Sequence, residues 1–158
     1  MSSLNKPSAM NEAVVVRNAV INDSTVLSRL LGELGFPSAP DTVSHRLRSM
    51  QAFGESVLVA EREGKVIGLL TLHIMPVLHR PAPVGRVSAL VVAQQERGKG
   101  VGRALVSAGQ DLLQQRGCMM IEVTSNQRLQ ESNQFYRQVG FEEASLRFKK
   151  DLGHRNAF

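Results

Sequence analysis

Seven consecutive residues combine glycines with cations: Arg97-Gly98-Lys99-Gly100-Val101-Gly102-Arg103. They follow a valine-rich run and precede an amphipathic one, so they stand where a strand should turn into a helix. The first backbone N–H groups of a helix lack internal partners, and together with the helix dipole they attract anions. Glycine also lets a phosphate oxygen approach the backbone without a Cβ in the way. This glycine-rich turn (97–103) is therefore predicted to bind phosphate, with Arg97, Lys99 and Arg103 adding positive charge.

Two common phosphate motifs match the glycine-rich turn only in part. A P-loop ends in Gly-Lys-Ser/Thr, whereas Gly102 is followed here by Arg103-Ala104, so the lysine–hydroxyl pair is missing. The dinucleotide fingerprint fits Gly98 and Gly100, and Glu122 follows at about the 20 residues it asks for. However, Arg103 occupies its third small position, and little chain remains after Glu122. A nicotinamide or flavin binder stays open, as does a basic loop whose glycines serve only turn geometry.

Hydrophobic periodicity places this turn in a succession of strands and helices. The expected strands are residues 13–17, 56–60, 66–74, 86–92 and 119–123, with one or two more in 141–150. The expected helices run over about 24–34, 41–50, 100–116 and 129–139. This order predicts a mixed α/β domain with a strand–loop–helix–strand unit in its second half.

Composition bounds the class of protein. The chain has 158 residues, 42% of them apolar, which fits one globular domain. A single cysteine, Cys118, excludes an internal disulfide, and with four histidines it argues against a metal site. The net charge of +5 permits an anionic partner, but only 4% of residues are aromatic, which disfavours nucleic-acid binding by base stacking. No apolar run is long enough to span a bilayer, so no membrane partner is expected.

The first residues are small and polar. Residues 1–11 lack the basic start and apolar run of a signal peptide. We expect them to form a flexible tail before one domain at 12–158, and we expect a cytoplasmic location by default.

Two segments together resemble the GNAT acetyltransferases. Gln95-x-x-Gly98-x-Gly100, followed by Val101-Gly102-Arg103-Ala104-Leu105, resembles the acyl-coenzyme A signature of that family. Asn133-Gln134-Phe135-Tyr136-Arg137-Gln138-Val139-Gly140-Phe141 resembles its second motif. The resemblance extends over roughly residues 13–150. It implies a single GNAT-like domain, in which helices flank a central twisted mixed sheet whose two parallel strands splay apart.

The resemblance also implies a cosubstrate, acetyl-CoA, and residues that hold it. The backbone of Leu90, Val91 and Val92 would bond the pantetheine arm, as a strand edge can. The pyrophosphate would rest on the glycine-rich turn, and Asn126 or Asn133 would contact the coenzyme arm. Tyr136, the chain's only tyrosine, matches the tyrosine that serves as general acid for the departing thiolate. The turn contributes Arg97, Gly98, Lys99, Gly100, Val101, Gly102 and Arg103 to this set.

The proposed general base departs from the family pattern. Many members carry a carboxylate in the strand before the signature, but here those positions read Arg86-Val87-Ser88-Ala89, in which Ser88 is a weak substitute. Glu122 on the neighbouring strand is the candidate base, and the alternative for it is an ion-paired strand residue. His73 and His79 lie near where acceptors bind in the family, and either could accept a proton.

A second departure concerns the residue seven positions before the tyrosine. Many members have asparagine there, and this chain has Leu129.

The function expected overall is direct transfer of an acetyl group from acetyl-CoA to a primary amine, with no metal. The acceptor is expected to be a small molecule or a peptide. The alternative is a weak or inactive acyl-CoA-binding regulatory module. A homodimer is possible, since family members are often dimers.

Overall fold

The computed structural model describes residues 12–125 and 128–153. Contacts divide the chain into two compact units, Met1–Val123 and Thr124–Phe158. The first unit holds the sheet, and the second holds one helix and the segment after it. Among the described residues no helix is long and apolar enough to cross a membrane.

Five strands of the first unit form one sheet in the order β1-β2-β3-β4-β5. The strands are β1 (Val15–Asn18), β2 (Ser56–Arg62), β3 (Lys65–Met75), β4 (Val84–Val92) and β5 (Met120–Val123). Neighbours from β1 to β4 are antiparallel, and β5 runs parallel to β4. The mixed sheet expected from the sequence is therefore confirmed. Glu63 and Gly64 join β2 to β3 with φ of 51° and 72°, which suits a tight hairpin.

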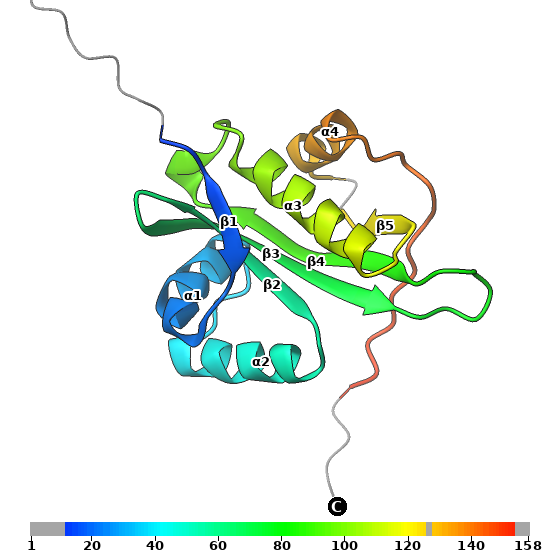
Figure 1. Ribbon diagram of the computed structural model, residues 1–158, viewed down its shortest axis with the longest axis horizontal. Coiled ribbons are helices and arrows are strands. Elements are labelled where there is room, and N and C mark those ends of the chain that lie inside the picture. Colours follow the sequence, from blue (N-terminus) through cyan, green and yellow to red (C-terminus); the bar gives the residue numbers. More distant parts are fainter. Residues whose placement is uncertain (1–11, 126–127, 154–158) are drawn as a thin grey trace, which may run out of the picture. The chain divides into compact units, whose positions relative to one another are not determined.

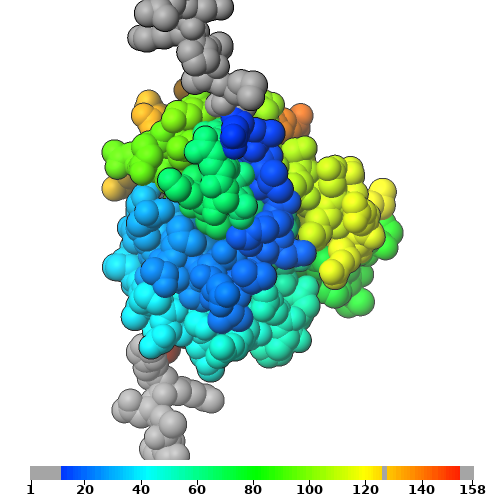
Figure 2. Space-filling view, turned by 60° about the vertical axis from the view of Figure 1, so that its left-hand side comes forward, coloured from blue at the N-terminus to red at the C-terminus, as the bar shows by residue number. Residues whose placement is uncertain are grey.

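Helices cover both faces of this sheet (Figure 1). Helices α1 (Ser24–Glu33) and α2 (Pro40–Ala52) pack on one face, where their leucines and valines meet Val59, Leu69 and Val91. Helix α3 (Val101–Gln115) packs on the other face against Leu70 and Leu72. Short 3₁₀ turns precede α1 (Ile21–Asp23) and follow β4 (Gln94–Glu96). In Figure 2 the blue-to-cyan atoms of β1, α1 and α2 form one continuous surface.

Three glycines let α3 lie close against the sheet. A Cβ on Gly68 of β3 would come 2.9 Å from Leu105 Cδ1, and one on Gly109 of α3 would come 2.7 Å from Leu70 Cδ2. A Cβ on Gly85 of β4 would overlap the buried side chain of Leu113. Close packing at these three positions fixes α3 against the sheet, and it thereby fixes the position of the N-terminus of the helix.

The second unit contains α4 (Gln130–Gln138). After it, residues 141–153 form neither helix nor strand, so the one or two strands expected in 141–150 are wrong. Leu146 and Phe148 alternate with cations as in a half-buried strand, yet their exposed fractions are 73% and 90%. A strand needs a partner for its backbone groups, and the described part of this unit contains no other strand.

Candidate functional site

The glycine-rich turn joins β4 to α3 in a conformation that requires glycine. Gly98 and Gly100 have φ of 74° and 82°, in the left-handed region. Gly100 is the N-cap of α3, and a Cβ placed on it would meet nothing within 4 Å. Val101 is 1% exposed and anchors the first turn of the helix in the core. The turn is thus an exposed loop that the buried Val101 side chain fixes to the core. It ends at the N-terminus of α3, where backbone N–H groups can bind an anion.

Acidic side chains accompany two cations of this turn. Arg97 Nη2 lies 3.6 Å from Glu33 Oε2 at the end of α1, and its Nε donates to the carbonyl oxygen of Val92 at 3.0 Å. Lys99 Nζ lies 3.7 Å from the Glu96 carboxylate, which also accepts a bond from Arg62. The turn is therefore less positive than its sequence suggests, and backbone amides would contribute more to anion binding.

Strands β4 and β5 stay paired over four positions only, from Val84↔Met120 to Val87↔Val123. Strand β4 continues to Val92, so residues 88–92 extend beyond the last paired position on that side. Their other side remains paired with β3 as far as Gly68↔Val92. Pairing between the two parallel strands thus ends where β5 ends, at Val123. Leu90, Val91 and Val92, the residues expected to bond the pantetheine arm, lie in the extension.

Glu122 of β5 faces Arg86 of β4. The two residues are directly paired in the register, and Arg86 Nη1 lies 3.0 Å from Glu122 Oε1. The Glu122 side chain is 41% exposed. A guanidinium thus occupies one oxygen of the candidate base, which favours the structural alternative for Glu122.

A bulge in β4 brings the Ser88 hydroxyl beside two polar side chains of β3, Thr71 and His73. Thr71 pairs with Ala89 and Leu72 with Val87, so Ser88 has no partner residue on β3. Its hydroxyl lies 2.6 Å from Thr71 Oγ1 and 2.6 Å from His73 Nε2. On the other side of the ring, His73 Nδ1 lies 3.1 Å from Glu55 Oε2.

The sequence pointed to His73 and Ser88 separately and did not connect them. Glu55, which precedes β2, was missed, because only the strand register brings it beside His73. The Thr71-x-His73 alternation at the end of an otherwise apolar strand was the signal that could have found this face. His79, the other histidine considered, is exposed in the loop between β3 and β4.

Tyr136 lies on α4 among aromatic rings of the second unit. Its ring centroid is 5.3 Å from that of Phe135 and 5.5 Å from that of Phe141, both in edge-on geometry. Burial raises the pKa of the Tyr136 hydroxyl. The hydroxyl therefore keeps its proton at neutral pH, as a general acid must. Asn133 is half-buried on the same helix, and Asn126 lies outside the described residues.

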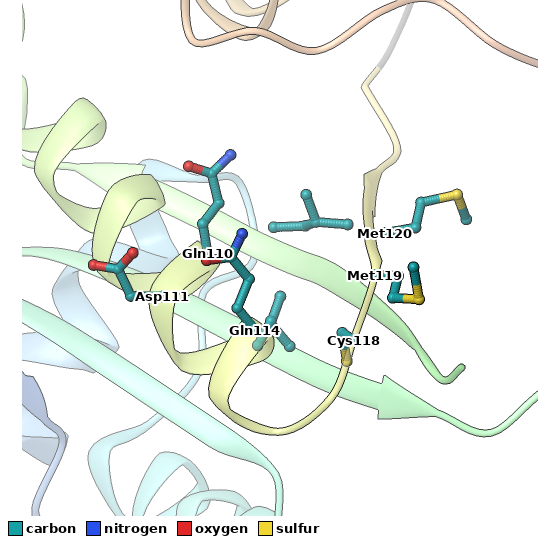
Figure 3. A pocket seen from close by; sticks show the side chains of 8 residues that line it. Gln110, Asp111, Gln114, Cys118, Met119 and Met120 are labelled. Atoms are coloured by element: carbon teal, nitrogen blue, oxygen red, sulfur yellow. The ribbon is translucent and has the colours of Figure 1, made fainter. Parts of the chain in front are cut away.

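A separate hollow lies toward the other end of α3 (Figure 3). Gln110 and Gln114 of α3 line it together with Cys118, Met119 and Met120 at the start of β5. Cys118 is 6% exposed, and burial raises the pKa of its thiol, so it behaves as a core residue, as expected. Among the described residues no group of three or more His, Cys, Asp or Glu could hold a metal ion.

Comparison with known proteins identifies the family to which this chain is similar. Residues 27–141 match the family described as Acetyltransferase (GNAT) family. The chain is 30% identical over 94 residues to an aminoalkylphosphonate N-acetyltransferase of Salmonella typhimurium, covering 60% of this chain and 61% of that protein. It is 29% identical over 141 residues to an aminoglycoside N(6')-acetyltransferase type 1 of Stenotrophomonas maltophilia, covering 83% and 88%.

Solved structures share the fold at low sequence identity. A transcriptional regulator from Bacillus halodurans superposes with a TM-score of 0.81 at 20% identity, covering 89% of this chain and 100% of that one. An aminoglycoside N-acetyltransferase in complex with CoA superposes at 0.80 with 18% identity, covering 92% and 99%. The matches to the first two curated relatives span 61% and 59% of their lengths.

Proposed function

The chain belongs to the GNAT acetyltransferase family, and we propose that it transfers an acetyl group from acetyl-CoA to a primary amine. The observation that carries the proposal is the junction of β4 and α3. There residues 88–92, which extend past the last position paired with β5, lead into a turn with two left-handed glycines, Gly98 and Gly100, at a helix N-terminus. A ligand that combines amides with phosphates fits such a junction.

We propose that each part of acetyl-CoA binds to residues of this junction whose chemistry fits it. The backbone of Leu90, Val91 and Val92 would bond the pantetheine amides. The turn (Arg97, Gly98, Lys99, Gly100, Val101, Gly102 and Arg103) would hold the pyrophosphate. Asn133 and Asn126 are proposed to contact the coenzyme arm, Asn126 on sequence alone.

The transfer would be direct, in a ternary complex of enzyme, acetyl-CoA and amine. Binding brings a neutral amine against the thioester carbonyl, which lowers the barrier by proximity and orientation. Backbone N–H groups of the strand edge could polarise the carbonyl. Tyr136, whose pKa is raised by burial, is proposed to protonate the departing thiolate. Glu122 remains a proposed base on sequence grounds, although its ion pair with Arg86 argues for a structural role.

The amine acceptor is proposed to be a small molecule. Curated relatives are named for acetylation of aminoalkylphosphonates, glucosamine 6-phosphate and aminoglycosides. These names supply a panel of test acceptors: 2-aminoethylphosphonate, glucosamine 6-phosphate and sisomicin.

A second candidate is a module that binds acyl-CoA without turnover. It is favoured by the lack of a carboxylate at 86–89. Two measurements on the full chain separate the candidates. Calorimetric titration with CoA should give saturable binding in both cases, and thiol release from acetyl-CoA with the acceptor panel should occur only for the enzyme. Failure of CoA to bind or to raise the melting temperature at millimolar concentration would contradict both.

A further inference from the structure

The polar face described at the β4 bulge has an internal order of donors and acceptors. The Glu55 carboxylate has no hydrogen to donate, and His73 Nδ1 lies 3.1 Å from its Oε2, so any proton between these two atoms belongs to His73. With a proton on Nδ1, the neutral imidazole has its lone pair on Nε2, and in this tautomer the Ser88 hydroxyl at 2.6 Å donates to it. Carboxylate, imidazole and hydroxyl therefore form a Ser88–His73–Glu55 triad, in which Ser88 hydrogen-bonds to His73 and His73 lies within ion-pair distance of Glu55.

The position of Ser88 links this triad to the proposed chemistry. Ser88 is exposed, whereas Val87 before it is buried in the core, so the bulge turns the hydroxyl outward. Ser88 is also the first β4 residue beyond the pairing with β5, and it is two residues before Leu90. The hydroxyl is thus at the strand edge where the thioester is proposed to lie.

We propose that the triad is the general base of this enzyme: Ser88 takes the proton of the acceptor amine and passes its own to His73, which Glu55 orients. This rests on the function proposed above. The amine lone pair forms the C–N bond to the thioester carbonyl carbon, and the C–S bond breaks with its electron pair going to sulfur. The amine proton goes to Ser88 Oγ, the Ser88 hydroxyl proton goes to His73 Nε2, and the thiolate takes a proton from the general acid.

Other charged groups face His73 and set its surroundings. On the β2 side its neighbour is Glu55. On the β4 side its direct cross-strand partner is Arg86, which is in turn paired with Glu122 of β5. His73 thus has one carboxylate in contact and a guanidinium across the strand whose charge is offset by a second carboxylate. Replacing Glu55 by glutamine removes the contacting charge and keeps the shape, so it tests the orienting role directly.

The test measures proton transfer and not only activity. In the full chain, kcat/KM for the best acceptor of the panel is recorded across pH, and the His73 ring nitrogens are followed by NMR in the same range. The variants are His73→Gln, Ser88→Ala, Ser88→Thr and Glu55→Gln. The matched controls are His45→Gln, an exposed histidine on α2, and Glu63→Gln, an exposed carboxylate in the hairpin turn.

The expected result has three parts. His73→Gln and Ser88→Ala lower kcat/KM near neutral pH by roughly 10²-fold, the size of a general-base contribution, and leave CoA binding unchanged. Ser88→Thr, which keeps the hydroxyl, restores much of the loss, and the controls change little. The rising limb of the wild-type pH profile is absent in His73→Gln and displaced in Glu55→Gln.

Three outcomes would overturn the proposal. One is a pH profile that His73→Gln leaves unchanged, and another is a neutral ring with its proton on Nε2. The third is an acetyl group found on Ser88 by mass spectrometry after mixing with acetyl-CoA alone, because Ser88 would then be a nucleophile. If the wild type acetylates no amine, the proposed function fails and the triad with it. Acetylation that survives His73→Gln, Ser88→Ala and Glu55→Gln refutes the triad alone.

Discussion

Replacing Gly100 by alanine separates two reasons for having glycine at the start of α3. Gly100 has φ of 82°, and an added Cβ would meet no protein atom within 4 Å. The cost to folding is therefore backbone strain alone, about 1–2 kcal/mol. For a domain of this size, that corresponds to a fall in melting temperature of roughly 2–8 °C. Gly100→Asn should lose less, because asparagine tolerates the left-handed region.

Coenzyme binding should respond differently from stability. If a phosphate oxygen approaches the Gly100 backbone, a side chain there weakens CoA binding in both Gly100→Ala and Gly100→Asn, by about tenfold or more. Gly117→Ala is the matched control, since Gly117 has φ of 83° and also no atom within 4 Å, but follows the other end of α3. It should lose the same stability and bind CoA normally.

Thermal unfolding and calorimetric titration with CoA measure the two effects. A Gly100→Ala protein that melts like the wild type would refute the strain argument. Normal CoA affinity in both Gly100 variants would refute the close approach of phosphate, and the glycine would then serve turn geometry only.

Three further changes have defined outcomes. Tyr136→Phe should lower kcat by about 10²-fold or more without altering CoA affinity, measured by thiol release; full activity would exclude Tyr136 as the acid. Asp23→Asn removes the negative charge and one of the two oxygens that accept bonds of 2.8 and 3.0 Å from Arg17, and it should cost about 1–3 kcal/mol in urea unfolding at neutral pH. Arg17 lowers the pKa of Asp23 in the folded protein, so the ion pair stabilises the fold above about pH 4, the pKa of Asp in the unfolded chain. This stabilisation is lost as the pH falls through the folded-state pKa of Asp23, so the unfolding free energy of Asp23→Asn should fall less steeply with acid. An equal slope in variant and wild type would contradict this. Gly85→Ala should cost about 1–3 kcal/mol by overlap with Leu113, and adding Leu113→Ala should relieve part of it; simple additivity of the two losses would contradict the overlap.

Local features of this fold were predictable from sequence, and features that depend on register were not. The hairpin at Glu63-Gly64 and the glycine-rich turn follow from residue types a few positions apart, and both were located correctly. The contact of Glu55 with His73 joins neighbouring strands, and Ser88 reaches His73 only because a bulge shifts the pairing by one residue. Periodicity cannot reveal a bulge, since the apolar pattern continues on both sides of it.

The error in residues 141–150 has a related cause. Leu146 and Phe148 alternate with Arg147 and Lys149, a pattern typical of a strand with one buried face. Such a strand forms only if another strand pairs with it. Whether it has one depends on the rest of the molecule, so a pattern in one segment cannot decide it. Tyr136 illustrates the opposite case, because its neighbours Phe135 and Phe141 lie in the same motif and the aromatic cluster is local.

Acidic side chains of the protein itself partly neutralise the cations of the glycine-rich turn. Glu33 and Glu96 stand beside Arg97 and Lys99, so part of the positive charge is neutralised before any ligand arrives. An arriving polyphosphate would exchange internal partners for its own oxygens and would displace fewer dissolved anions than the number of cations implies. If this turn holds the phosphates of CoA as proposed, coenzyme affinity should depend only weakly on ionic strength and persist at salt concentrations that release ligands from basic surfaces without such acidic partners.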